Sequence, residues 1–378
     1  MARFLHTSDW HLGRSLHGTS LLEHQQVFLE WLVAEAVNRE VDAVLVAGDV
    51  YDRAVPPSDA VRLLDRALAG FALAGVPVVV SSGNHDSAVR LGFGASLASA
   101  ARVYLRTQLR DLLEPVVVDG GGVGVYAIPY LLPDAVMAEL GCERSHTGVL
   151  TAAVDRIRTD AAARGLAHTV VLAHAFVTGG SASDSERDIS VGGIGDVAAS
   201  VFAGIDYVAL GHLHGAQQVA PGVRYSGSPL PFSFSERHHH KSVVLVEVDA
   251  RGVRTELVPT PVPHPMHELR GNLAELLALS PGPPADSWLK VVLTDVHRPA
   301  APMEQLRERW PNTVILDHRP PVELGSSAED LARLRQAADP VEVCSLFVEW
   351  VDSTYPDGRQ RDELASVVEA VRHTERSA

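Results

Sequence analysis

The chain of 378 residues has little cysteine, little lysine and no long hydrophobic run. Its two cysteines, Cys142 and Cys344, offer neither a disulfide framework nor the spacing of a zinc ribbon. No apolar run reaches the roughly 20 residues that a membrane helix needs, and the first residues lack the character of a signal peptide. These absences argue against a disulfide-stapled secreted domain and a membrane-spanning protein, and we expect a cytoplasmic protein.

Positive charge is also scarce. The formal net charge is -15 at pH 7, and Lys241 and Lys290 are the only lysines. This balance argues at first against a polyanionic substrate, although bound cations can make one site positive in an acidic protein. With 46% hydrophobic and 21% charged residues, the chain has the composition of a globular protein, and its length predicts two domains with a tail.

Several predicted strands end in polar residues that can bind metal. The strands are unbroken apolar runs, typical of sheets covered on both faces, and helical segments separate them, which predicts an α/β fold. Strand ends on one edge of a parallel or mixed sheet lie together, so their side chains can form one site. The residues at these ends are Asp9, His11, Asp49, Asn84, His85, His174, His212 and His214.

The later part of the pattern predicts further elements. Ser58 is the expected N-cap of the second helix. His238-His239-His240 is interpreted as a solvated turn, with a metal-binding tract as the alternative. We interpret three segments after His214 as strands of a second sheet, namely 223–230, 242–249 and 253–258.

Two proline-containing breaks indicate domain boundaries, at 261–265 and at 355–358. The tail carries an apolar stripe that either packs on its own domain or docks to a partner. The stripe consists of Leu364, Val367, Val368 and Val371. The predicted domains are residues 1–260, residues 265–352 and a helical tail at 353–378.

The donor set predicts a two-metal site. Apart from His85, the strand ends offer nitrogen and oxygen ligands without a thiolate, which suits Mn, Fe, Zn or Mg rather than a structural zinc. Asp49, alone after its glycine, is the expected bridge between the metals. Two divalent cations against two ligand carboxylates leave a formal charge of +2, which suits a phosphodiester. Such a pair, about 3.5–4 Å apart, lowers the pKa of a bridging water and neutralises a phosphoryl oxygen. His85 would then contact the phosphate or protonate the leaving oxygen.

The motifs at the strand ends resemble those of the calcineurin-like metallophosphoesterase family. They are Asp9-x-His11, Gly48-Asp49-x-x-Asp52, Gly83-Asn84-His85-Asp86, His174 and Gly211-His212-x-His214. The resemblance implies that Asp9, His11, Asp49 and His214 bind one metal and that Asp49, Asn84, His174 and His212 bind the other. It also implies that His85 assists catalysis.

Four further stretches are similar to the bacterial SbcD-type nuclease subunits of this family. They are His11–His17, Gly48–Pro56, Ser185–Gly193 and Tyr225–Ser233, and the similarity spans Arg3 to Asp249. Asp52 departs from the archaeal and eukaryotic relatives, which tend to have His there. This departure favours the bacterial branch and leaves the role of Asp52 open.

The resemblance implies a four-layer αββα sandwich, followed by a small α/β capping domain that contacts DNA. The helical spacing of the apolar stripe adds a C-terminal helix. The resemblance also implies an Mn-dependent 3′→5′ exonuclease on duplex DNA that is also an endonuclease on single strands and hairpins. Such enzymes serve DNA repair, recombination and replication on the nucleoid. The implied partner is an SbcC-type coiled-coil ATPase, in a two-plus-two assembly that contains a homodimer of this chain. Candidate DNA contacts are Arg14, His17, Arg53, Arg90 and Arg187, with a surface or salt-bridge role as the alternative for each arginine.

Two alternatives remain from the residues alone. The same metal core serves phosphatases and phosphodiesterases that act on small nucleotides, although the extra domain after Pro265 argues against an enzyme of minimal length. A scaffold without metal is the other alternative, and the complete set of ligand types argues against it.

Overall fold

The computed structural model describes residues 1–118, 122–186, 197–320, 328–352 and 354–376. Its chain divides into two compact units, residues 1–266 and residues 267–378. We describe each unit by itself.

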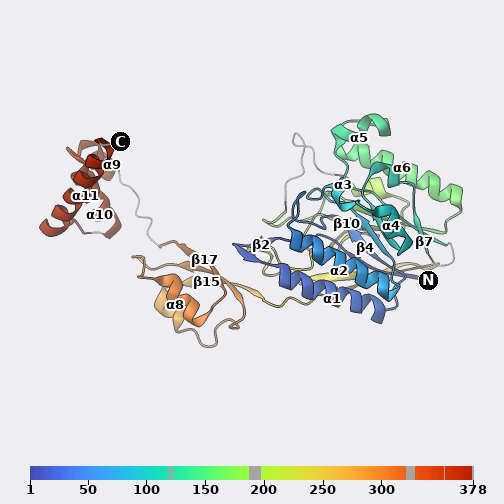
Figure 1. The fold of residues 1–378 in the computed structure, drawn as a ribbon, viewed down its shortest axis with the longest axis horizontal. Coiled ribbons are helices and arrows are strands. Elements are labelled where there is room, and N and C mark those ends of the chain that lie inside the picture. Colours follow the sequence, from blue (N-terminus) through green and yellow to red (C-terminus); the bar gives the residue numbers. More distant parts are fainter. Residues whose placement is uncertain (119–121, 187–196, 321–327, 353, 377–378) are drawn as a thin grey trace. The chain divides into compact units, whose positions relative to one another are not determined.

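In the described ranges, the first unit contains two six-stranded sheets (Figure 1). The first sheet consists, in spatial order, of β14 (Gly252–Pro259), β13 (Ser242–Asp249), β1 (Ala2–Thr7), β4 (Ala43–Ala47), β5 (Val78–Ser81) and β6 (Val103–Arg106). The second consists of β11 (Gln217–Ala220), β12 (Val223–Tyr225), β10 (Tyr207–Gly211), β9 (His168–His174), β8 (Val123–Ala127) and β7 (Val116–Val118). The central strands of both sheets are parallel, so their carboxyl ends lie on one edge of each sheet.

The two sheets pack face to face because their strands are apolar on both faces. In β4, Val44 and Val46 contact the helices outside the sheet, whereas Ala43, Leu45 and Ala47 contact the cluster between the sheets. Successive side chains of a strand point to opposite faces, so an unbroken apolar strand can belong to two cores at once.

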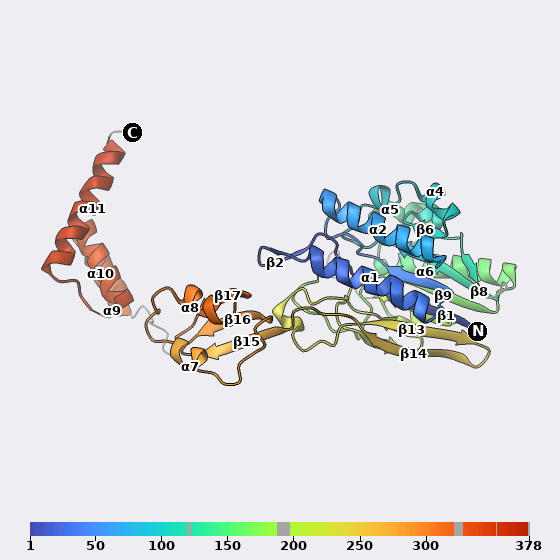
Figure 2. The same cartoon turned by 60° about the horizontal axis from the view of Figure 1, so that its bottom comes forward.

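Helices cover the outer face of each sheet (Figure 2). Those against the first sheet are α1 (Leu22–Asn38) and α2 (Ser58–Ala74), and those against the second are α5 (Pro133–Leu140) and α6 (His146–Arg164). The hydroxyl of Ser145 caps α6 by accepting the N–H of Gly148 at 2.9 Å, and Gly165 ends it with φ of +67°. The predicted four-layer αββα sandwich is confirmed.

Two details of the prediction are wrong. Ser58 is the first residue of α2 rather than its cap, because the extended residue before the helix is Pro57. Strands β13 and β14 belong to the first sheet, where β13 pairs antiparallel with β1, and do not belong to the second. Alternation along a strand shows which face is buried, but it does not show which sheet edge a hairpin joins.

Shorter elements connect the layers. They are the hairpin β2 (Ser15–Leu16) and β3 (Thr19–Ser20), helices α3 (Ala88–Leu91) and α4 (Ala95–Ala100), and the 3₁₀ turns at Leu109–Asp111, Ala199–Phe202 and Phe234–Glu236.

The second unit contains a small α/β part and a group of helices. A three-stranded sheet consists of β15 (Met266–Gly271), β16 (Trp288–Leu293) and β17 (Thr313–His318), and α7 (Leu273–Leu277) and α8 (Pro302–Arg309) accompany it. Leu276, Val291, Leu306 and Trp310 belong to its hydrophobic core. The helices α9 (Ala328–Gln336), α10 (Pro340–Asp352) and α11 (Gly358–Arg376) follow, and α10 contacts both α9 and α11. No described helix combines the length and apolar character that crossing a membrane requires.

Candidate metal centre

The structure brings the predicted ligands together where strands of both sheets end. In chain order they are Asp9 and His11 after β1, Asp49 after β4, Asn84 and His85 after β5, His174 at the end of β9, and His212 and His214 after β10. All of them are buried except Asn84, which is half-buried. Buried histidine and carboxylate groups need partners, and here they are partners of one another.

One group of donors consists of Asp9, His11 and His214, whose ligand atoms lie within 4.8 Å of one another. The Nε2 atoms of His11 and His214 are 3.2 Å apart. Within the described part of the chain, the Nδ1 atom of His11 has no hydrogen-bond partner. Nitrogen atoms that converge in this way on a carboxylate suit a divalent cation.

A second group consists of Asp9, Asp49 and His174, again within 4.8 Å. Oδ2 of Asp49 lies 3.5 Å from Nε2 of His174 and 3.7 Å from Nε2 of His11, so this carboxylate reaches both groups. Asp9 belongs to both groups as well. The geometry therefore offers two carboxylates in positions from which a bridge between two cations can form.

Asn84 and His212 lie beside the second group. Nδ1 of His174 faces the carbonyl of Ala47 at 3.0 Å, so Nε2 of the same ring faces Oδ1 of Asn84 at 2.9 Å. Burial alone would lower the pKa of His174, but the Asp49 carboxylate raises it to about 9. The oxygen atoms of Asp49 and Asn84 both face Nε2 of His174. Either a proton on this nitrogen or a cation between the three side chains would therefore be stabilised there. The ring of His212 lies 5.5 Å from that of His174.

His85 lies against the cluster and is also buried. Its Nδ1 donates to the carbonyl of Asp52 at 2.8 Å, which leaves Nε2 on the side of Asp49, 3.9 Å from Oδ2. The carboxylate of Asp52 lies 3.6 Å from Nδ1 of His11, and the donors of His11, Asp52 and His85 form a third compact group. Asp52 is thus part of the site, although its sequence position left its role open.

The site is built on strained backbone. Asp9, His11, Asp49 and His212 have φ values of 53°, 44°, 50° and 113°, in a region that side-chain-bearing residues rarely adopt. Each residue in this conformation lowers the stability of the folded state by on the order of 1–3 kcal/mol, and such residues cluster at functional sites. Backbone hydrogen bonds between the loops after β1 and β4 hold two of them, from Asp9 N–H to Gly48 O at 3.1 Å and from His11 N–H to Asp49 O at 3.0 Å.

Two polar side chains secure the loops that carry the ligands. Asp86 accepts the N–H groups of Val50, Tyr51 and Gly83 at 2.8–3.1 Å and so joins the loop after β4 to the loop after β5. An edge of this residue reaches solvent, but its carboxyl group is enclosed, and burial together with Asp49 raises its pKa to about 7. Gly83 has no room for a side chain, since a Cβ atom there would lie 2.1 Å from Oδ1 of Asp49.

Gln25 secures the loop after β1. Its amide donates to the carbonyl groups of Trp10 and His11 at 3.1 and 2.7 Å, and its carbonyl accepts the N–H of Gly13 at 3.0 Å. The pattern of α1 gives no signal for this role, because a glutamine on a helix is ordinarily solvated.

Burial and mutual charge separate the protonation behaviour of the ligands. Burial lowers the pKa of His11 well below its ordinary value and that of His212 to about 3. Burial raises the pKa of Asp9 to about 6. Burial alone would raise the pKa of Asp49 too, but the neighbouring His174 and His11 hold it well below the ordinary value. Neutral His11 and His212 beside an ionised Asp49 are in the forms that bind metal, whereas His174 must lose its proton to bind one.

Of the candidate DNA contacts that the structure describes, Arg14, His17 and Arg53 lie on loops and Arg90 lies on α3. Arg14 donates to the carbonyl of Ser185 at 3.0 Å and stacks over Phe232 at 4.8 Å, so it is engaged within the protein. Arg53 is exposed and lies 3.5 Å from Asp52. The other candidates are exposed Arg90, which donates to the carbonyl of Ala54 at 3.0 Å, exposed His17, whose ring lies 6.0 Å from that of Phe234, and Arg187, which lies outside the described residues. Their contact with DNA stays a prediction.

Comparisons with known proteins place these observations in a family. Residues 2–216 match the family model for calcineurin-like phosphoesterases. Residues 262–351 match the model named SbcD_C, described as the type 5 capsule protein repressor C-terminal domain.

Two solved structures show distant similarity. A dimetal phosphatase from Danio rerio aligns with 14% identity and a TM-score of 0.42, covering 69% of this chain and 99% of its own. The sulfate thiohydrolase SoxB from Thermus thermophilus aligns with 13% identity and a TM-score of 0.35, covering 68% of this chain and 56% of its own. Similarity at this level carries no argument, so the assignment depends on the family models.

The family match covers more than half of the chain, including every predicted ligand. The resemblance predicted from the strand-end motifs is confirmed, including its SbcD-type branch, because the second model matches the region after Pro261. The chain belongs to the calcineurin-like phosphoesterase family and is a metal-dependent phosphoesterase with an SbcD-type C-terminal region.

Proposed function

We propose that this protein is the nuclease subunit of an SbcCD-type complex, a two-metal, manganese-dependent phosphodiesterase that cuts DNA. It acts as a 3′→5′ exonuclease on duplex DNA and as an endonuclease on single strands and hairpins, in end processing and repair on the cytoplasmic nucleoid. The observation that carries the proposal is the presence, on one chain, of a phosphoesterase match over 2–216 and an SbcD_C match over 262–351.

We assign the ligands to two cations that share Asp49. One set is Asp9, His11, Asp49 and His214, and the other is Asp49, Asn84, His174 and His212. The distances of 3.5 and 3.7 Å from Oδ2 of Asp49 to His174 and His11 support this carboxylate as the bridge. Two cations held there would supply an activated water as nucleophile and would neutralise charge on the phosphoryl group.

His85 is assigned to catalysis rather than to metal binding. Because its Nδ1 donates to the carbonyl of Asp52, the ring is fixed with Nε2 toward the site. From there Nε2 can hydrogen-bond the transferring phosphate or deliver a proton to the leaving oxygen.

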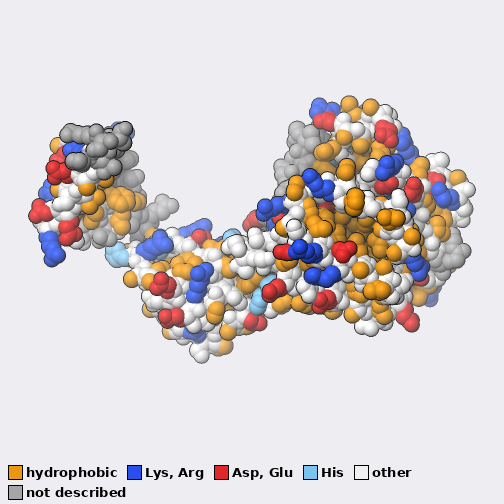
Figure 3. Space-filling view, viewed as in Figure 1, with side chains coloured by type: hydrophobic (Ala, Val, Ile, Leu, Met, Phe, Trp, Pro, Cys, Tyr) orange, Lys and Arg blue, Asp and Glu red, His pale blue; other side chains and the backbone are white. Residues whose placement is uncertain are grey.

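We propose that the helices of the second unit dock an SbcC-type ATPase. Helix α10 exposes Phe347 and Trp350 to 58% and 44%, and Figure 3 shows hydrophobic side chains on the surface of this group of helices. In the predicted stripe on α11, Val367 and Val371 are exposed. Exposed apolar side chains on adjacent helices suit the apolar face of a partner helix.

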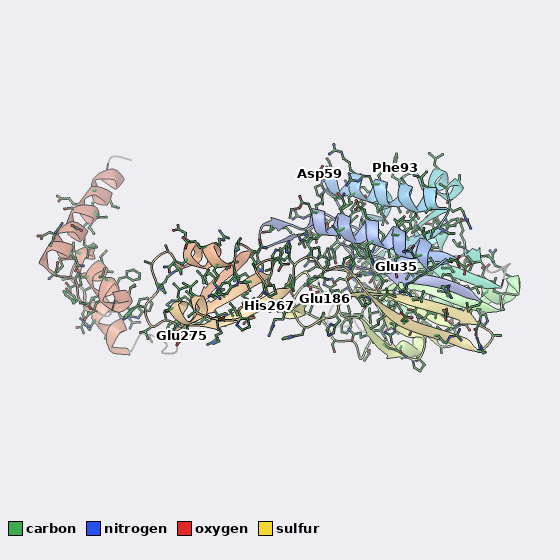
Figure 4. All side chains as sticks on the ribbon, turned by 90° about the horizontal axis from the view of Figure 1, so that it is seen from below. Glu35, Asp59, Phe93, Glu186, His267 and Glu275 are labelled. Carbon is green, nitrogen blue, oxygen red and sulfur yellow. The ribbon has the colours of Figure 1, made fainter. Side chains whose placement is uncertain are left out.

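We propose that a homodimer forms through the first unit. Val89 on α3, Phe93 between α3 and α4, and Leu97 on α4 are exposed to 74%, 89% and 82%, and Phe93 is labelled in Figure 4. A group of large apolar side chains this exposed is typical of an association surface.

Residues 265–352 and the arginines around the site are proposed to contact DNA.

The test is cleavage of a labelled DNA hairpin and a blunt duplex with Mn²⁺, beside bis-p-nitrophenyl phosphate. Metal-stripped protein and His85→Ala are run in parallel, with and without an SbcC-type partner. Cleavage of DNA that needs the metal and His85 supports the proposal. Turnover of the small ester with intact DNA, even with the partner present, would overturn it in favour of a small-nucleotide phosphodiesterase.

A further inference from the structure

The ring of His214 contacts a buried polar network away from the other ligands. Its Nδ1 lies 2.6 Å from the hydroxyl of Ser185, which lies 2.5 Å from Oε1 of Glu236. Lys241 donates to Oε2 of Glu236, to the hydroxyl of Ser228 at 2.9 Å and to the carbonyl of His214 at 2.9 Å. All five residues are buried.

The backbone of His214 is held as well. Its N–H donates to Oε1 of Glu186 at 2.8 Å, and Glu186 is labelled in Figure 4. Together with the Lys241 contact to its carbonyl, this fixes the peptide groups on both sides of the ring. The network therefore fixes both the position and the orientation of one predicted ligand.

The network also sets the direction of its hydrogen bonds. Lys241 donates to Oε2 of Glu236 in a buried ion pair, and the ammonium charge keeps the carboxylate ionised. An ionised carboxylate only accepts, so the hydroxyl of Ser185 donates to Glu236 and its lone pair accepts the Nδ1–H of His214. A neutral imidazole has one N–H, so Nε2 carries a lone pair where it faces His11.

We propose that Ser185, Glu236 and Lys241 are positioning residues that hold His214 as the Nδ1–H tautomer and thereby set the affinity for the cation bound by Asp9, His11 and His214. This inference rests on the proposed two-metal function. Groups that orient a histidine ligand in this way typically change metal affinity by about 10–100-fold. His174 and Asn84, which would hold the second cation, have their hydrogen bonds to each other and to Ala47 rather than to this network, so the affinity for that cation should be unaffected.

A purely structural role is the competing explanation. A buried ion pair such as Glu236 with Lys241 is weak evidence for stability, because apolar replacements of such pairs are often neutral or stabilising. The two explanations differ in what they predict for the ring of His214, so the experiment reads out that ring directly.

The first measurement is the tautomer of His214 in the metal-free full-length protein. Histidine is labelled with ¹⁵N, and the His214 signal is assigned with His214→Gln. The wild type is expected to show Nδ1–H. Ser185→Ala removes the nearer acceptor of Nδ1 and leaves only Oε1 of Glu236 at 3.5 Å, and Glu236→Gln removes the fixed direction, so both should show substantial Nε2–H. Ser242→Ala, which removes a buried hydroxyl that does not contact His214, should keep the wild-type signal.

The second measurement is Mn²⁺ binding to the same proteins by titration calorimetry and electron paramagnetic resonance. Ser185→Ala and Glu236→Gln should weaken one of two Mn²⁺ ions by about 10–100-fold, and Ser242→Ala should match the wild type. Ser185→Thr restores the hydroxyl and should recover at least part of the lost affinity. Unchanged thermal unfolding of Ser185→Ala separates the effect from loss of fold.

The outcomes separate the inference from the proposed function. A wild type that binds no Mn²⁺ overturns the proposed function. A wild type that binds two ions, with Ser185→Ala and Glu236→Gln that keep Nδ1–H and both affinities, overturns the inference and leaves the function standing. Weakening of both ions to the same extent also overturns it, because the network contacts one ligand only.

Discussion

The metal centre of the first unit and the helices of the second unit differ in which side chains they bury and which they expose. At the centre, polar groups such as Asp49 and His174 are buried and bound to one another. On α10, apolar groups such as Phe347 and Trp350 are exposed. Both arrangements work against folding stability, since buried polar groups and exposed apolar groups are each unfavourable. The first arrangement suits a bound cation, and the second suits a partner.

The largest effect should come from His85→Ala. The ring contacts the cluster without being needed as a ligand, so its loss should reduce cleavage by about 10²–10⁴-fold, the usual contribution of a general acid or base. Metal content, measured by mass spectrometry, should stay near the wild-type value. Loss of metal in step with loss of activity would make His85 a ligand and end its assigned role.

Asp49→Asn should have the next largest effect, on metal binding. A bridge serves both cations, and the amide lacks the charge, so both Mn²⁺ affinities should fall by at least about tenfold. Calorimetric titration measures the two together. If only one affinity changes, Asp49 does not bridge, and Asp9, which also belongs to both donor groups, becomes the candidate.

The buried interior of the first unit should also make its folding stability depend on pH in the acid range. His6 on β1 is fully buried between Tyr207 and the carbonyl of Leu210, and burial lowers its pKa to about 3. Between pH 3 and 6.5 the unfolded chain binds the proton and the folded chain does not, so stability rises with pH by up to about 1.4 kcal/mol per unit.

His6→Gln keeps two hydrogen-bonding atoms without titrating in this range. Its unfolding free energy in urea, measured in EDTA at pH 4.5, 5.5 and 7, should rise less steeply with pH than that of the wild type. Parallel curves for the two proteins would show that His6 does not contribute to the acid sensitivity.

The smallest effect on the isolated chain should come from Phe347→Ser with Trp350→Ser. Exposed side chains contribute little to folding, so the unfolding free energy should change by less than about 1 kcal/mol. Binding to the SbcC-type partner, followed by sedimentation, should be lost. Retained binding would remove α10 from the proposed docking surface, and Val89→Ser on α3 is the control expected to leave that binding intact.

Most residues of the metal centre could be predicted from the sequence, because each ligand directly follows or ends a strand in the same short stretch. A buried strand followed by a donor, as in Ala43 to Asp49, is readable in one stretch. Sheet membership was not readable, and β13 and β14 were assigned to the wrong sheet, because pairing with β1 joins distant segments.

The network behind His214 was not readable either. Glu236 and Lys241 flank the exposed histidines His238, His239 and His240, so the whole segment has the polarity of a solvated turn. Only the fold shows that the two flanking charges turn inward while the histidines stay at the surface.

The most direct test of the two-metal site is a crystal structure of the full chain with Mn²⁺, with anomalous diffraction recorded near the manganese absorption edge. We expect two peaks about 3.5–4 Å apart. One should lie among Asp9, His11 and His214, and the other among Asn84, His174 and His212, with Asp49 between them. One peak, or none at saturating Mn²⁺, would contradict a two-metal site.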